Sequence, residues 1–145
     1  MGSNQLEKVD LSFIANTITD AIEDGVIEEA KMEEMHHFCK GVYARELFIP
    51  KGTILVGKIH RYECINIMLK GDIIVYDGGE SKRINKPFIK VSPPGTQRAG
   101  YVLEDTIWIC IHGTNSRNLE KIEKKFIAPD KNDALLLKEL RRLKG

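Results

Sequence analysis

Several side chains that could bind an anion gather in the stretch 52–71, which reads GTILVGKIHRYECINIMLKG. Lys58, His60 and Tyr62 have the same parity in this stretch, and side chains of one parity on a strand point to one face. We expect these three side chains to project together and to be joined by Asn66 from the following strand. Such a face would offer a ligand hydrogen-bond donors and an aromatic ring.

A further cation, Arg98, follows the Pro-Pro-Gly turn at 93–95. Its guanidinium carries five donors in a fixed fork that suits a carboxylate or a phosphate. Nearby aromatic rings could stack on an aromatic or sugar ring of the same ligand. The sequence therefore predicts a pocket for an anionic or nucleotide-like small molecule. The predicted ligand-binding residues, which supply charge, hydrogen bonds or flat rings, are Lys58, His60, Tyr62, Asn66, Arg98, Tyr101, Trp108 and His112.

The strongest of these candidates also have structural interpretations. Trp108 and Tyr101 are aromatic residues of the kind that fill a β-core. Arg98 could form a salt bridge with Glu104 or Asp105 instead of binding a ligand.

The histidines and cysteines do not predict metal or nucleophilic chemistry. A bound transition metal needs several imidazole or carboxylate donors that converge on one point. His60, Glu63 and His112 are the set that the sequence offers, and we expect no metal cofactor. Cys64 and Cys110 lie near the histidines, but a catalytic cysteine also needs an oriented base and an oxyanion site.

The elements that must position these residues read as strands of a small barrel. Strand-like runs at spacings of about 8–12 residues extend from 42 to 113, as in sandwiches and barrels. The sequence Asp-Gly-Gly at 77–79 predicts a hairpin, because such a turn needs positive φ. Two of the runs, 98–104 and 105–113, are predicted to be separate strands that meet at Glu104-Asp105.

Both ends of the chain read as helix. Residues 11–38 are predicted to form two helical segments separated at Asp24-Gly25, and residues 117–144 to form two more, separated at Pro129. Short amphipathic helices are marginal alone, so their apolar faces must pack on the barrel or on a second subunit. Acidic residues near 20–34 and basic residues in the C-terminal helices favour a homo-oligomer assembled through these helices.

The overall composition narrows the function classes. The chain has 145 residues, a net charge of +1 and a pI near 7.7. It is long enough for one domain, and its balanced charge gives no reason to expect binding to nucleic acid or to an anionic membrane. No apolar run approaches the ~20 residues of a membrane span. Three scattered cysteines indicate reduced thiols and hence a cytoplasmic protein.

The spacing of the pocket residues resembles the two motifs of the cupin superfamily. In that family, His-x-His followed by a glutamate, and a later histidine after Pro-x-Gly, supply the ligands of one metal. Here His60-x-Tyr62 occupies the His-x-His place, Asn66 the place of the glutamate, and Arg98 the place of the later histidine. The chain therefore resembles a cupin in which most of the metal ligands have been replaced.

The resemblance implies a mainly β fold, the cupin-type double-stranded β-helix or jelly-roll barrel, with helices at both ends. The barrel is expected at 42–115, with helical segments at 1–41 and 116–145. The block PFIKVSPPGTQRAGYVLEDTIWICIHG looks most like small single-domain cupin-like proteins of bacteriophages. For such a protein, the resemblance implies the sequestering of a host small molecule, for example a nucleotide immune signal, in the host cytoplasm.

Three functional hypotheses follow. The first is a non-catalytic cupin that binds an anionic or nucleotide-like molecule. The second is a metal-dependent cupin enzyme such as an oxygenase or isomerase, and the third is an interaction protein whose barrel is filled by side chains. Metal analysis separates the first two. A ligand that raises thermal stability separates the first from the third.

Overall fold

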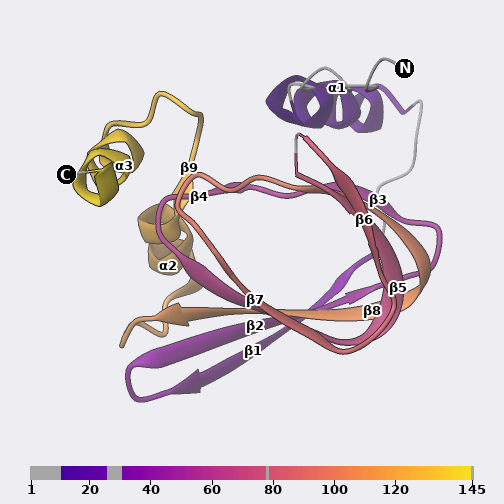
Figure 1. Cartoon of the computed structure of the whole chain (residues 1–145), viewed down its shortest axis with the longest axis horizontal. Helices are drawn as coiled ribbons and strands as arrows, with labels where there is room; N and C mark the ends of the chain where they lie inside the picture. The colour runs from indigo at the N-terminus through magenta and orange to yellow at the C-terminus, as the bar shows by residue number, and fades with distance from the viewer. Residues whose placement is uncertain (1–10, 26–30, 78, 145) are drawn as a thin grey trace, which may run out of the picture.

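The computed structural model describes residues 11–25, 31–77 and 79–144, which form an antiparallel β-barrel with flanking helices (Figure 1). The predicted mainly β barrel with helices at both ends is confirmed. The strands are β1 (Glu33–Cys39), β2 (Val42–Ile49), β3 (Ile54–Val56), β4 (Ile59–His60), β5 (Cys64–Tyr76), β6 (Ser81–Ile84), β7 (Phe88–Ser92), β8 (Ala99–Gly113) and β9 (Ile127–Ala128). The helices are α1 (Leu11–Glu23), α2 (Leu119–Phe126) and α3 (Ala134–Lys144).

The main sheet has the strand order β1-β2-β8-β5-β6, with β3 also paired to β8 and β7 also paired to β5. A separate pair, β4 and β9, joins the barrel to the C-terminal segment. In Figure 1, α2 and α3 lie beside β4 and β9, whereas α1 lies apart from them, near β3. No helix in the described part of the chain is long and apolar enough to cross a membrane.

The longest strand, β8, is continuous where the sequence predicted two strands. The predicted junction at Glu104-Asp105 is wrong, because β8 runs through it from Ala99 to Gly113. The pairing of β5 with β8 instead shifts register around Gly71, as at a β-bulge. A Cβ on Gly71 would lie 2.2 Å from Thr106 Oγ1, so only glycine allows the two strands to cross this closely.

The prediction of helix over 26–38 is wrong for Glu33 onward, where the chain forms β1. Residues 26–30 lie outside the described residues. β1 is the edge strand and pairs along its whole length with β2, from Glu33 opposite Phe48 to Cys39 opposite Val42. Its side chains are largely exposed, so the strand conformation of β1 results from backbone pairing with β2 rather than from burial of an apolar face.

Other local predictions are confirmed. α1 ends at Glu23, and Gly25 has a positive φ of 74° at the predicted interruption. β5 and β6 form the predicted hairpin, with Tyr76 opposite Ser81 and with Asp77 Oδ1 accepting hydrogen bonds from the backbone of the turn. The Pro-Pro-Gly turn at 93–95 leads from β7 towards Arg98.

The apolar side chains form one central cluster and two satellites. The central cluster fills one part of the barrel and comprises Leu47, Ile49, Met68, Ile73, Ile84 and Val102. One satellite seats α2 on the barrel through Tyr43, Ile122 and Phe126. The other seats α3 through Ile59, Ala128 and Leu136. The leucines of α3 thus pack on the barrel through Leu136, which is 2% exposed.

A buried ion pair fixes the C-terminal helices on the corner between β4 and β5. Arg61, 8% exposed, donates from Nε and Nη2 to the two carboxylate oxygens of Asp133, at 2.8 and 2.9 Å. Its Nη1 donates to the carbonyl oxygens of Lys124 and Lys125 at the end of α2. Asp133 also caps α3, because its Oδ1 accepts from Leu136 N at 2.9 Å. One side chain therefore orients both helices.

Replacing Asp133 by Ala should lower the melting temperature by about 5 °C or more, because both the ion pair and the cap are lost. Asp133→Asn keeps a capping side chain and removes only the charge, so we expect a smaller loss. Scanning calorimetry at neutral pH measures both variants. Arg83→Ala, which breaks an exposed ion pair with Asp72, is the matched control. Equal melting temperatures of Asp133→Ala and Arg83→Ala would contradict the stabilising role of Asp133.

The same pair predicts a pH dependence. The hydrogen bond from Arg61 lowers the pKa of Asp133 to about 2. Its contribution to stability is therefore present above the pKa of an unfolded aspartate, about 3.9, and is lost as the pH falls towards 2. Asp133→Asn should remove this part of the acid destabilisation.

We also propose that the protein is a homo-oligomer, because apolar side chains remain exposed on two described surfaces. On α3, Leu135 and Leu143 are 52% and 55% exposed, and on β7, Ile89 and Val91 are 69% and 54% exposed.

Sedimentation should show a dimer or larger species at micromolar concentration. Leu135→Glu with Leu143→Glu should dissociate it if the helices meet as predicted. If only Ile89→Glu with Val91→Glu does so, the sheet face is the interface. A wild-type monomer at tenfold higher concentration would contradict assembly.

Candidate functional site

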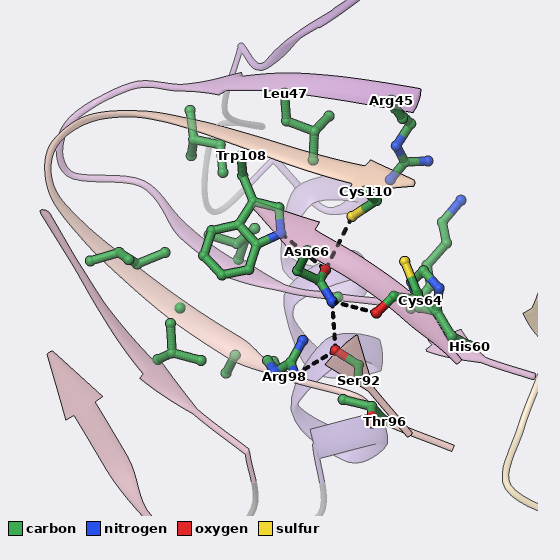
Figure 2. A pocket seen from close by; sticks show the side chains of 18 residues that line it. Arg45, Leu47, His60, Cys64, Asn66, Ser92, Thr96, Arg98, Trp108 and Cys110 are labelled. Atoms are coloured by element: carbon green, nitrogen blue, oxygen red, sulfur yellow. Dashed lines mark hydrogen bonds between the residues drawn. The ribbon is translucent and has the colours of Figure 1, made fainter. Parts of the chain in front are cut away.

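The barrel encloses a cavity of about 130 Å³ with an apolar part and a polar part (Figure 2). Strand alternation selects the side chains that point inward, and these are polar towards one end of the strands and aliphatic towards the other. The apolar lining comes from Leu47, Ile49, Leu55, Ile73, Val75 and Trp108. The polar lining comes from Arg45, Lys58, His60, Cys64, Asn66, Ser92, Thr96, Arg98 and Cys110.

Asn66 organises the polar part of the cavity. Its Nδ2 donates to Ser92 Oγ at 2.5 Å and to the carbonyl of Cys64 at 3.3 Å. Its Oδ1 accepts from Trp108 Nε1 at 3.2 Å and from Cys110 Sγ at 3.4 Å. Asn66, which the sequence predicted as a ligand contact, is therefore buried and bonded to the protein itself. Its hydrogen bonds fix the indole of Trp108 and the hydroxyl of Ser92.

Arg98 completes this chain and faces the cavity. Its Nη2 donates to Ser92 Oγ at 2.6 Å, and its side chain is half-buried. Because Ser92 Oγ already accepts from both Asn66 and Arg98, its hydroxyl proton is directed to a further acceptor. The guanidinium and this hydroxyl together form a donor group at the cavity wall.

The alternative of a structural salt bridge at Arg98 is not found. Glu104 pairs with Lys51 at 3.6 Å, and Asp105 accepts a hydrogen bond from the backbone of the same lysine. Among the described residues, no carboxylate lies within ion-pair distance of Arg98. Burial lowers the pKa of Arg98, and the more distant negative charge of Asp77 only partly opposes this effect.

A second arginine, Arg45 on β2, lines the cavity and was missed by the sequence analysis. Its Nε is buried without a hydrogen-bond partner, and no described carboxylate pairs with it. The signal was present in the alternation, because Arg45 shares the inward parity of Tyr43, Leu47 and Ile49. A charged residue on the apolar face of a strand indicates a functional position more often than a core position.

The two histidines near the polar end are neutral. Burial, together with neighbouring cations, lowers the pKa of His60 and of His112 to about 4 in each case. Their rings stack with centroids 5.5 Å apart, and His112 also packs on Phe126 at 4.6 Å. Whereas His60 lines the cavity, His112 lies behind it.

Three other predicted residues differ in their placement. The chain bends at Arg61-Tyr62, so Tyr62 does not follow the parity of His60 and instead packs edge-on against Phe126, with centroids 6.0 Å apart. Tyr101 has the opposite parity to Trp108 on β8, points outward and is 44% exposed. Lys58 reaches the cavity wall but its ammonium pairs with Glu123.

No family model and no curated protein matches this sequence. Solved structures match its fold. KdgF from Halomonas sp. is 18% identical over 66% of this chain and 87% of that chain, with a TM-score of 0.52. An RmlC-like cupin from Shewanella frigidimarina is 17% identical over 63% and 83%, with a TM-score of 0.51. Salicylate 1,2-dioxygenase from Pseudoaminobacter salicylatoxidans is 10% identical over 82% of this chain and 36% of that chain, with a TM-score of 0.55. The barrel is thus the predicted cupin-type jelly roll.

The metal that this fold commonly holds does not fit the residues at its usual positions. Of these, Tyr62 turns away, the amide of Asn66 is committed to protein partners, and Arg98 is a cation. Only His60 remains as a donor. Glu63, part of the donor set considered from the sequence, is exposed.

The structure brings together a different group of donors, His60, Cys64 and His112, whose ligand atoms lie within 4.8 Å of one another. Two features oppose a cation there. A hydrogen bond with Cys110, and burial, raise the pKa of the Cys64 thiol, so it would have to lose a proton to bind metal. The positive charge of Arg45 lies close enough to lower the pKa of both imidazoles. The protonated thiol is also a poor nucleophile.

We therefore expect protein purified without added metal to contain well under one equivalent of any transition ion. Elemental analysis by inductively coupled plasma mass spectrometry measures this content. Near-stoichiometric zinc, iron, manganese, nickel or copper, lost in both His60→Ala and Cys64→Ser, would contradict this expectation. His37→Ala, which changes an exposed histidine on β1, is the control for adventitious binding.

Proposed function

We propose that the protein binds a small anionic molecule in the barrel cavity and does not transform it. The observation that carries the proposal is Arg98, a half-buried cation that lines the cavity, whose guanidinium donates to the Ser92 hydroxyl and forms no ion pair with a carboxylate among the described residues. A guanidinium that has lost water without a counter-charge is stabilised by an anion that supplies one.

The cavity limits the size of this molecule. Its volume, about 130 Å³, is close to that of an engineered cavity of about 150 Å³ that holds benzene. The aliphatic and indole lining suits a short apolar body, and the arginine end suits an acidic group. This supports a small organic acid more strongly than a whole nucleotide.

A nucleotide would need the groove outside the cavity. This outer groove, of about 480 Å³, shares Thr96 and Arg98 with the cavity and is also lined by Lys90 and Lys131. Arg98 thus stands between the groove and the cavity, where an entering anion would meet it first. The proposed role in sequestering a nucleotide signal for a bacteriophage rests on the resemblance of the sequence, and nucleotides belong in the ligand screen.

The absence of catalysis is proposed from the chemistry of the polar wall. The thiol of Cys64 is held protonated, and the imidazoles are neutral and packed against aromatic rings. None of the described residues combines a nucleophile with an oriented base and oxyanion donors at the cavity. The alternative, a metal-dependent oxygenase or isomerase, would be supported by the stoichiometric metal described above.

The test is a thermal-shift screen with organic acids, sugar phosphates and nucleotides, followed by calorimetry with the compounds that raise the melting temperature. Arg98→Ala should weaken binding by about 1.5–3 kcal/mol, or roughly ten- to a hundredfold, because a charge-assisted contact is lost. Arg98→Lys should restore only part of it, since an ammonium lacks the planar fork. Arg83→Ala, on the β5–β6 hairpin, should bind as the wild type does.

Apo melting separates binding from a structural role. Both Arg98 variants should melt close to the wild type without ligand. Unchanged affinity together with a lower apo melting temperature would show that Arg98 supports the fold and does not bind the ligand.

A further inference from the structure

We infer that the ligand carries two separate acidic groups, one held by Arg98 and the other by Arg45 and His60. The inference rests on the proposed function and specifies its ligand class as a small dianion, such as a short dicarboxylate or a phosphonocarboxylate.

The first observation is the position of Arg45 and His60 between two hollow spaces. Both residues line the barrel cavity, and both also line a second chamber of about 80 Å³. This chamber lies between the barrel and α2, and is bounded by Tyr43, His112 and Phe126 among others. Arg45 and His60 are therefore accessible to a molecule in the cavity and form its inner end. Arg98 lies at the other side, where the cavity meets the outer groove. Figure 2 shows the two arginines well apart, with Asn66 between them in the view.

The second observation is the pair of unsatisfied atoms at this inner end. Arg45 Nε and His60 Nδ1 are the two buried side-chain nitrogen or oxygen atoms without a hydrogen-bond partner in the described part of the chain. Buried polar atoms are nearly always paired, so each such exception indicates a missing partner. Both exceptions belong to residues shared by the cavity and the chamber, which places the missing partner at their junction.

The third observation is the charge around Arg45. The two acidic residues that line the chamber with Arg45 have other partners, because Glu123 pairs with Lys58 and Glu34 lies 3.6 Å from His36. Glu46, its neighbour on β2, pairs with His37 at 3.1 Å. Among the described residues, Arg45 and Arg98 thus both lack a carboxylate partner. A monoanion bound at Arg98 would leave the charge of Arg45 uncompensated, whereas a dianion compensates both.

The geometry of the cavity sets the shape of the dianion. A cavity of about 130 Å³, close in volume to one that holds benzene, holds a chain of about four to six carbon atoms. The two acidic groups of such a chain would both lie in the polar part of the cavity, one at Arg45 and one at Arg98, and the carbons that join them would extend towards Trp108 and the aliphatic lining. A carboxylate and a phosphonate can each accept two hydrogen bonds from a guanidinium, and the titrations below distinguish them.

The experiment compares diacids with their monoamides, which have nearly the same size but one charge fewer. Succinate and succinamate, and glutarate and glutaramate, are titrated into wild-type protein by calorimetry. We expect each diacid to bind at least tenfold more tightly than its monoamide. 3-Phosphonopropionate against propionate tests the phosphonate form, and malonate to adipate locates the spacing of the two groups.

Variants then test which residue binds the second acidic group of the ligand. Arg45→Met keeps the length and packing of the stem and removes the charge, so it should reduce diacid affinity to that of the monoamide and leave monoamide affinity nearly unchanged. Arg98→Ala should weaken both members of each pair. Arg45→Lys, as a second variant, should retain part of the diacid preference. Apo melting confirms that each variant is folded.

The outcomes separate this inference from the proposed function. If monoamide and diacid bind equally and both depend on Arg98, the cavity binds an anion but the second acidic group is refuted. If the diacid preference persists in Arg45→Met, another residue holds that group, and the assignment to Arg45 is wrong. If none of these acids binds and the wider screen finds no ligand that depends on Arg98, both the inference and the proposed function fail.

Discussion

The bidentate pair between Arg61 and Asp133 is the interaction on which the site depends. Arg61 directly follows His60, and its guanidinium binds the cap of α3 and the last carbonyls of α2 at once. The backbone of His60 is in turn paired with Ile127 on β9. At the inner end of the cavity, His60 is therefore held by the C-terminal segment, which is far from it in sequence, whereas Arg45 lies on β2 of the main sheet.

The barrel combines an apolar half that favours folding with a polar half whose charges oppose folding. The aliphatic half buries Met68 and Val102 completely, and such burial is the main favourable term in folding. The polar half encloses two arginines without carboxylate partners, and a buried cation without a counter-charge opposes folding. The hydrogen bonds of Asn66 give this half its rigidity, because they fix Trp108 and Ser92 before any ligand arrives. Such pre-organisation lowers the ordering cost of binding.

Local signals in the sequence were sufficient where turn chemistry or alternation decides the structure. The hairpin at Asp77, the Pro-Pro-Gly turn and the inward position of Trp108 follow directly from the residues concerned. β1 was mistaken for helix because its acids and histidines show no clear alternation, and only pairing with β2 makes it a strand. The continuous β8 could not be predicted, since the bulge opposite Gly71 arises from contacts between distant strands.

The site was predicted in part, for equally specific reasons. His60, Asn66, Arg98 and Trp108 converge because they have inward parity on strands that face one another. Tyr101 was misplaced because its parity opposite to Trp108 was not applied. Arg45 was missed although its parity was readable from β2, and the His60–Cys64–His112 cluster needed the pairing of β5 with β8 to become visible.

The pairing of β4 with β9 also has a consequence for biosynthesis. Chains are made from the N-terminus and begin to fold before they are complete. Strands β1 to β8 leave the ribosome before Ile127 and Asp133, so the barrel can assemble while β4 still lacks its pairing with β9 and Arg61 lacks its ion pair with Asp133. In a nascent barrel the part of the inner wall around His60 is therefore not yet held in place, until the chain has been synthesised through the start of α3.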